Sequence, residues 1–158
     1  MLSHIDNENK PTMVDVSEKG ISLRQARAQA KLKLGQEIMS ELNNGEIKSK
    51  KGPVFATAII AGTMAAKKTS ELIPFCHPVA LEAIKIEINA INASEVLIEA
   101  SVKTSHKTGV EMEALVAANI AALTVYDMCK AMSQKIEISE SYLLAKTGGK
   151  ADYKRAEQ

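Results

Sequence analysis

Three stretches of the chain alternate between apolar and polar residues, which is the pattern of a half-buried β-strand. Every second residue is apolar over residues 24–34, 84–88 and 96–102. A period of two places alternate side chains on opposite faces of a strand. In the first stretch the unbroken alternation outweighs the helical preference of Ala, Arg, Gln and Lys. A turn around residues 92–94 joins the other two stretches, so we predict an antiparallel hairpin.

Two longer, largely apolar stretches predict helices. The first, residues 53–70, starts with a proline, which suits the first helical turn, and its Gly62 permits close packing. The second covers about residues 110–132. A short helix over about residues 36–42 and a last strand over about residues 135–144 complete the predicted elements.

Without the short extra helix, the predicted order is βαββαβ. This is the split βαβ order of a ferredoxin-like α+β domain, in which an antiparallel sheet carries its helices on one face. The other face must be solvated or covered by a partner chain. The chain has 158 residues, of which 46% are hydrophobic, enough for one core. We predict a single catalytic domain over residues 13–158 and a flexible arm over residues 1–12, which hold little that can pack.

Composition narrows the classes of partner and compartment. The formal net charge of +1 argues against a strongly basic body that binds nucleic acid, so any anion site must be local. Aromatic residues are only 3% of the chain and are scattered, which argues against an RNA-stacking sheet. We recognise no signal peptide, no CxxC motif and no apolar run of membrane-spanning length. These features favour a cytoplasmic protein without a membrane partner.

Four residues are of the types that ligate zinc: Cys76, His77, His106 and Cys129. Structural zinc sites are marked by pairs of closely spaced ligands, and only Cys76-His77 is such a pair. We therefore predict no metal site. Both cysteines are interpreted as buried structural residues.

Ionisable residues stand at both ends of the long helix predicted over residues 110–132. Near its end, Asp127 and Lys130 are three residues apart and project from one helical face. A carboxylate beside an ammonium group on an apolar helix is a candidate acid/base pair, because burying such groups is costly unless they are paired or used. An ordinary salt bridge at a helix end is the alternative.

Cationic residues gather beside the predicted ends of elements. They are Arg24, Lys50, Lys51, Lys67, Lys68, Lys130, Lys146 and Lys150. Loops converge on sites at such ends, so a phosphate-rich ligand would suit these cations, although solvated surface lysines are the alternative. The run Gly148-Gly149-Lys150 lacks the Walker spacing, and we interpret it as a backbone turn that offers N–H groups to an anion.

A rigid loop precedes the predicted hairpin. Pro74 and Pro78 bracket residues 75–77 and restrict the backbone. Such a loop holds His77 in place, either for a function or simply to hydrogen-bond a carbonyl group.

Several motifs occur together and in order, in the company of Lys107-Thr-Gly-Val-Glu-Met-Glu-Ala-Leu115. They are Met13-Val-Asp-Val-Ser17, Lys51-Gly-Pro-Val-Phe-Ala-Thr57, Leu72-Ile-Pro-Phe-Cys-His-Pro78, Tyr126-Asp-Met-Cys-Lys130 and Leu144-Ala-Lys-Thr-Gly-Gly-Lys150. Together they resemble the molybdenum cofactor biosynthesis protein C family, the cyclic pyranopterin monophosphate synthases. The resemblance covers about residues 13–150. It implies the ferredoxin-like fold and a pyrophosphate-releasing lyase that converts (8S)-3',8-cyclo-7,8-dihydroguanosine 5'-triphosphate to cyclic pyranopterin monophosphate.

The resemblance also implies roles for individual residues. It assigns catalysis to Asp127, Lys130 and Lys51. It assigns substrate binding to Phe75, Cys76, His77, Glu111, Met112, Arg24 and Lys146. Opening the purine ring, forming the pterin and closing the cyclic phosphate all move protons and place charge on phosphate oxygens, so the reaction calls for acid/base groups among fixed cations. No cofactor is required; Mg²⁺ could accompany the triphosphate, but we recognise no carboxylate cluster built to hold it.

Helix geometry adds a prediction about assembly. Glu111 and Asp127 are sixteen residues apart, which separates them by roughly 24 Å along a helix axis. One compact pocket cannot readily use both from one chain, so a shared substrate requires a site between subunits. The resemblance implies a homohexamer built as a trimer of dimers. A regulatory nucleotide-binding module, which binds without turnover, is the alternative from another functional class.

Overall fold

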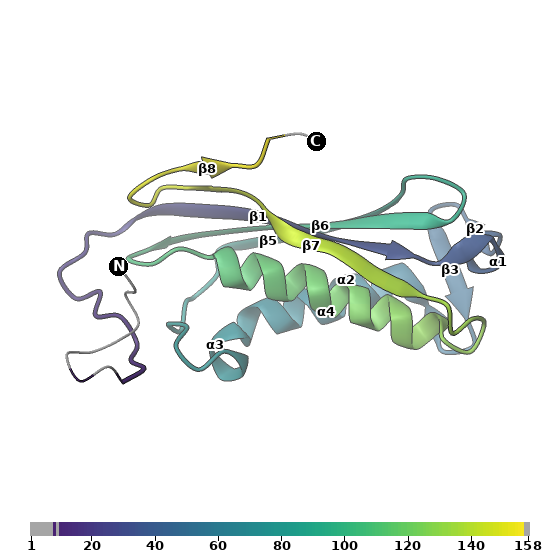
Figure 1. Ribbon diagram of the computed structural model, residues 1–158, viewed down its shortest axis with the longest axis horizontal. Coiled ribbons are helices and arrows are strands. Elements are labelled where there is room, and N and C mark those ends of the chain that lie inside the picture. Colours follow the sequence, from purple (N-terminus) through teal and green to yellow (C-terminus); the bar gives the residue numbers. More distant parts are fainter. Residues whose placement is uncertain (1–7, 9, 157–158) are drawn as a thin grey trace.

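The computed structural model describes residue 8 and residues 10–156, and its main feature is one five-stranded sheet (Figure 1). Its strands lie in the spatial order β5-β6-β1-β7-β8, and each neighbouring pair is antiparallel. The strands of this sheet are β1 (Ser22–Lys33), β5 (Ala83–Ala90), β6 (Glu95–His106), β7 (Glu137–Thr147) and β8 (Tyr153–Lys154). A second sheet is made of β2 (Leu42–Asn43), β3 (Glu46–Ser49) and β4 (Gly52–Pro53).

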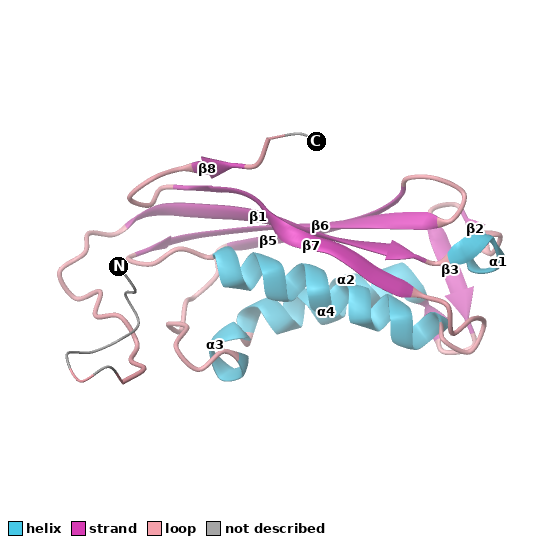
Figure 2. Ribbon diagram, in the orientation of Figure 1, coloured by secondary structure: helices cyan, strands magenta, loops and turns pink. Residues whose placement is uncertain are grey.

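The described residues form four helices: α1 (Gly35–Met39), α2 (Val54–Lys67), α3 (Thr69–Leu72) and α4 (Glu111–Cys129). The two long helices, α2 and α4, lie on the same face of the main sheet (Figure 2). The order β1-α2-β5-β6-α4-β7 and the antiparallel sheet confirm the predicted ferredoxin-like α+β fold.

Small residues let α4 approach the sheet closely. The inward-facing residues of β1 include Ala26, Ala28 and Ala30, and all three are buried. The sheet-side residues of α4 are also mainly alanines, and they are buried as well. At the contact between the two helices, a Cβ added to Gly62 would lie only 2.6 Å from the carbonyl oxygen of Ala117. The prediction that Gly62 permits close packing is confirmed.

The opposite face of the sheet is polar. Ion pairs join neighbouring strands across it, including Arg27 with Glu99 at 2.8 Å and Lys33 with Glu137 at 2.9 Å. Lys31 stands beside Glu95 at 3.8 Å. The more exposed pairs, Arg27–Glu99 and Lys33–Glu137, stabilise little, but the charged side chains make this face polar and distinguish it from the apolar face under α2 and α4.

The boundaries of the helices and strands differ from the predicted ones where the sequence shows no hydrophobic periodicity. The helix predicted over residues 53–70 is interrupted at Lys68, so that α3 is a separate turn, and Pro53 is the N-cap rather than a helical residue. The short helix ends earlier than predicted, at Met39. The strands β2, β3, β4 and β8 were not predicted, because two to four residues are too few to show an alternation. Of the arm predicted over residues 1–12, residues 1–7 and 9 lie outside the described residues.

Helix α4 corrects one statement made from sequence. By length and composition it is apolar enough to cross a membrane, although no such run was recognised. Half of that apolar window is buried inside the fold. The helix packs against both the main sheet and α2, which is the environment of a core helix.

Candidate active site

A cavity of about 720 Å³ lies at the N-terminal end of α4. The loop before β5 lines one side of it and β7 another. Six of the predicted substrate-binding residues line it: Phe75, Cys76, His77, Glu111, Met112 and Lys146. The structure therefore brings together residues from distant parts of the sequence that the resemblance assigned to one ligand.

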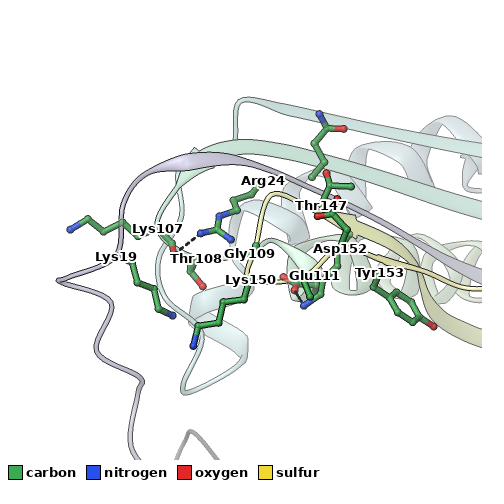
Figure 3. Close-up of a pocket in the computed structure, with 14 residues that line it drawn as sticks. Lys19, Arg24, Lys107, Thr108, Gly109, Glu111, Thr147, Lys150, Asp152 and Tyr153 are labelled. Atoms are coloured by element: carbon green, nitrogen blue, oxygen red, sulfur yellow. Dashed lines mark hydrogen bonds and ion pairs between the residues drawn. The ribbon is translucent and has the colours of Figure 1, made fainter.

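A second cavity of about 470 Å³ adjoins the first and contains Arg24, the seventh predicted substrate-binding residue. The two cavities share Lys146 and Lys150 as lining residues. Figure 3 shows Lys19, Lys107 and Lys150 around Arg24 at this cavity. Four lysines and an arginine around one opening favour an anionic ligand.

Arg24 is held by backbone carbonyl groups rather than by a carboxylate. Its Nε and Nη2 donate to the carbonyl oxygens of His106 and Lys107, each at 3.2 Å. The turn at Gly148 approaches the same strand so closely that an added Cβ would lie 1.8 Å from the carbonyl oxygen of Leu23. With a φ of +83°, this position suits glycine alone. In its two hydrogen bonds the Arg24 guanidinium group thus has no carboxylate partner.

The turn at Gly148-Gly149-Lys150 was predicted to offer backbone N–H groups to an anionic ligand, but the N–H of Gly148 already has a partner within the chain. The backbone N–H of Gly148 donates to the carboxylate of Asp152 at 3.0 Å. Lys150 lines both cavities, as expected for a residue near an anion. The cationic side chain, rather than the N–H of Gly148, is therefore the part of this motif that is placed to meet a ligand.

His77 hydrogen-bonds the N-terminal segment of the chain. Its Nε2 lies 2.7 Å from the carbonyl oxygen of Val14, which also lines the larger cavity. Lys107 holds the same segment by donating from Nζ to the carbonyl oxygen of Ser17 at 2.7 Å. The side chain and backbone N–H of Ser17 in turn lower the pKa of Asp15 by hydrogen bonding. His77 thus makes the hydrogen bond to a carbonyl group that was considered as its simple role, and it does so in the wall of a cavity.

Glu113 also lines this cavity and was not singled out from the sequence. Only 4% of its surface is exposed, and burial raises its pKa to about 6, with the nearby charge of Glu111 adding to the rise. Burial and the charge of Glu113 also raise the pKa of Cys76. The signal in the sequence was helical spacing, because Glu113 lies four and eight residues before the buried Ala117 and Ala121.

A second charged cluster lies at the other end of α4. The Asp127 carboxylate contacts Lys130 Nζ at 2.7 Å through Oδ1 and Lys51 Nζ at 2.6 Å through Oδ2. Lys51 Nζ also donates to the backbone carbonyl of Asp127 at 3.2 Å. Hydrogen bonds from Lys130 and then Lys51 lower the pKa of Asp127 to about 2, and the bond to Asp127 raises the pKa of Lys130. All three predicted catalytic residues are therefore in direct contact.

The two clusters do not meet within one chain. Glu111 begins α4 and Asp127 lies in its last turn, so they are separated by roughly 24 Å along the helix. None of the three predicted catalytic residues lines either cavity at the N-terminal end. The predicted site residues are thus split between the ends of one rigid helix.

The four residues weighed as zinc ligands are not assembled. Cys76 lines the larger cavity, whereas Cys129 is the last residue of α4 and is fully buried. Burial raises the pKa of Cys129 to about 11, as expected for a structural thiol. Within residues 8 and 10–156, no group of three or more His, Cys, Asp or Glu side chains is arranged to hold a metal ion.

Comparison with known proteins gives the same family as the motifs. Residues 13–149 match the MoaC family. The chain is 47% identical over 151 residues to the cyclic pyranopterin monophosphate synthase of Xanthomonas campestris pv. campestris strain B100, an alignment that covers 96% of this chain and 92% of that protein.

Two longer relatives are similarly close in sequence. Molybdenum cofactor biosynthesis protein 1 of Dictyostelium discoideum is 51% identical over 167 residues, and the molybdenum cofactor biosynthesis bifunctional protein of Synechocystis sp. is 49% identical over 156 residues. The alignments cover 95% and 96% of this chain but only 26% and 45% of those proteins. Because the family match covers most of its length, the chain belongs to the MoaC family.

Proposed function

We propose that this chain is a cyclic pyranopterin monophosphate synthase, a lyase of molybdenum cofactor biosynthesis. It would convert (8S)-3',8-cyclo-7,8-dihydroguanosine 5'-triphosphate to cyclic pyranopterin monophosphate and pyrophosphate. The observation that carries the proposal is the cluster at the end of α4, in which Lys51 and Lys130 both bind the carboxylate of Asp127. The family membership and a relative that bears the name of this synthase support the same conclusion.

The two joined cavities suit the triphosphate and base of this substrate. Volumes of about 470 and 720 Å³ lie within the range of roughly 300–1,000 Å³ that ligand pockets occupy. Arg24 offers a fork that can hold a phosphate through two hydrogen bonds, while Lys19 and Lys150 supply point charges. Lys146 is paired with Glu111 at 3.0 Å and would exchange this partner for phosphate.

The acid/base groups divide by their pKa values. With a pKa of about 6, Glu113 can both accept and donate a proton near neutral pH. Asp127, with a pKa of about 2, is an anion at neutral pH and holds no proton to donate. Its role is therefore to orient Lys51 and Lys130, which can stabilise negative charge on phosphate oxygens.

The substrate would be shared between two subunits. Because the clusters at the two ends of α4 are separated in one chain, a second chain must bring its Asp127 to the cavity that holds Glu111. The outer faces of α2 and α4 expose Ile60, Met64 and Leu123, which are 54–61% accessible. Exposed apolar residues of this size suit a subunit contact. We extend the proposal to a homohexamer built as a trimer of dimers.

We propose that the reaction needs no resident cofactor, because acid/base groups can promote the ring opening, the ring closure and the displacement at phosphorus. Magnesium bound to the triphosphate would enter with the substrate. Arg24 and the neighbouring lysines can neutralise the same oxygens without it.

The direct test is to incubate the purified chain with the cyclised dihydro-GTP and to measure pyrophosphate and a pterin product. The proposal expects both products in equal amounts. Tight binding of the substrate without either product would instead support a regulatory nucleotide-binding module. Absence of binding and turnover would contradict both functions.

A further inference from the structure

Helix α2 begins without a capping group of its own. Its N-cap is Pro53, which has no side-chain donor or acceptor. The first N–H groups of a helix have no partner within the helix and need an acceptor from elsewhere. Here the acceptor is Glu46, seven residues earlier, on β3.

One carboxylate makes three hydrogen bonds at this helix start. Glu46 Oε1 accepts from the N–H of Phe55 at 2.7 Å, and Oε2 accepts from the N–H of Ala56 at 3.0 Å. Oε1 also accepts from the N–H of Ile47 at 2.8 Å. The negative charge lies at the positive end of the helix dipole, which favours it further. Glu46 therefore binds the first turn of α2 and β3 at once.

The segment between Glu46 and α2 is the hairpin that carries Lys51. β3 and β4 are antiparallel, with Ser49 opposite Gly52, so Lys51 lies in the connecting turn. Ser49 fixes this turn, because its hydroxyl accepts from the N–H of Lys51 at 3.1 Å and donates to the carbonyl of Gly52 at 3.2 Å. The Lys51 side chain then extends to Asp127.

A lysine side chain on a short turn has many rotamers, so its aim depends on how firmly the hairpin is attached. We propose that Glu46 is a positioning residue, which ties the β3–β4 hairpin to the first turn of α2 and thereby aims Lys51 at Asp127. The inference rests on the proposed function only insofar as the Lys51–Asp127–Lys130 cluster acts on substrate. The positioning itself is a property of the free protein.

The alternative is that Glu46 only stabilises α2. A local cap would do that equally well, since Ser at an N-cap can accept the same N–H group. The double variant Glu46→Ala/Pro53→Ser separates the two roles, because it restores a cap to α2 without restoring the tie to β3. Glu41→Ala is the matched control, since it removes an exposed carboxylate that precedes the same small sheet.

The primary readout is the pKa of the Asp127 carboxyl group, measured by ¹³C NMR in the absence of substrate. Lys51→Ala should raise it by about one pH unit, as loss of a neighbouring cation does. Glu46→Ala should raise it similarly, and adding Lys51→Ala to Glu46→Ala should change it little. Pro53→Ser should restore the melting temperature of Glu46→Ala but leave the pKa raised. Glu41→Ala should leave the pKa at the wild-type value.

Turnover provides the second readout. Glu46→Ala should lower kcat by about tenfold through misplacement of Lys51, with a smaller change in KM. In the Lys51→Ala background the same substitution should lower kcat no further. If Glu46→Ala proves unfolded, Glu46→Gln, which keeps an oxygen acceptor, replaces it and should show the same direction of change.

Two results would overturn the inference. The first is an unchanged pKa of Asp127 in the folded Glu46 variant, or in Lys51→Ala. The second is recovery of both the melting temperature and the pKa when Pro53→Ser is added. A protein with no turnover at all but with the expected pKa changes would overturn the proposed function while supporting Glu46 as the positioning residue.

Discussion

The two ends of α4 hold carboxylates whose environments are opposite. At the N-terminal end, Glu113 is buried beside a cavity, and loss of water raises its pKa to about 6. At the C-terminal end, Asp127 is half exposed, and two lysines lower its pKa to about 2. One carboxylate can therefore exchange a proton at neutral pH, while the other stays charged.

This difference gives each end a distinct chemical capability. Pairs of titratable groups with pKa values pushed apart are typical of sites that need both an acid and a base. Arg24 and its neighbouring lysines accompany the proton-exchanging end, whereas at the charged end the lysines bind Asp127 directly. Neither end of α4 therefore combines the cations around Arg24 with the Lys51–Asp127–Lys130 cluster.

The largest expected effect comes from removing the charge of Asp127. Asp127→Asn is nearly isosteric, so the fold and substrate binding should persist while kcat falls by about 10²- to 10⁴-fold. Steady-state kinetics and a binding titration on the same preparation measure this split. A change confined to KM would mean that Asp127 binds the substrate without taking part in the chemistry.

The lysines around Asp127 should matter more than lysines elsewhere. Lys51→Ala and Lys130→Ala should each lower kcat by about 10²-fold, because each removes a fixed charge beside the reacting groups. Lys67→Ala, at the end of α2, removes an exposed lysine and should have little effect. Similar mild losses in all three variants would show that general positive charge is sufficient.

The smallest expected effect is on stability, at the buried end. Because the pKa of Glu113 is raised from 4.5 to about 6, Glu113 favours the folded state less as pH rises through this window. Glu113→Gln should therefore be more stable than wild type at pH 7, by roughly 1–2 kcal/mol, and similar to it at pH 4. Urea unfolding at fixed protein concentration measures the difference.

Two features make this pH comparison specific. Because the pKa of Asp127 is lowered from 3.8 to about 2, its ionised carboxylate stabilises the folded state at pH values above 3.8. This stabilisation is lost as the pH falls toward 2, which is below the range compared. Glu71→Gln, an exposed position on α3, is the matched control and should show no pH-dependent gain. Equal profiles for Glu113→Gln and wild type would mean that Glu113 ionises normally in the folded protein.

The main elements of the fold could be predicted because each has one buried face. Alternation along β1, β5 and β6 leaves a clear period of two in the sequence, whereas α4 is marked by the length of its apolar stretch. The break in the helix at Lys68 and the short strands around Lys51 show no such period in the sequence. Tertiary contacts rather than periodicity determine where these elements begin and end. The capping of α2 by Glu46 is such a contact.

The site could be predicted in part. Sequence spacing placed Asp127 beside Lys130 and separated both from Glu111, as the structure has them. The contact of Lys51 with Asp127 spans 76 positions and cannot be read from local spacing. Glu113 was not singled out, because Glu111 and Glu113 both lie in the first turn of α4 and the rotation of the helix against the sheet decides which of them is buried.

The proposed shared site requires the two ends of α4 to act on one substrate across a subunit boundary. Mixed refolding of Glu111→Ala and Asp127→Ala chains tests this requirement. Each variant alone should be nearly inactive. Half of randomly formed dimers would be mixed and would hold one intact site, so the mixture should regain about a quarter of wild-type activity. If mass spectrometry confirms mixed oligomers and the mixture stays as inactive as its parents, the two residues do not share a site and the proposal of a shared site is wrong.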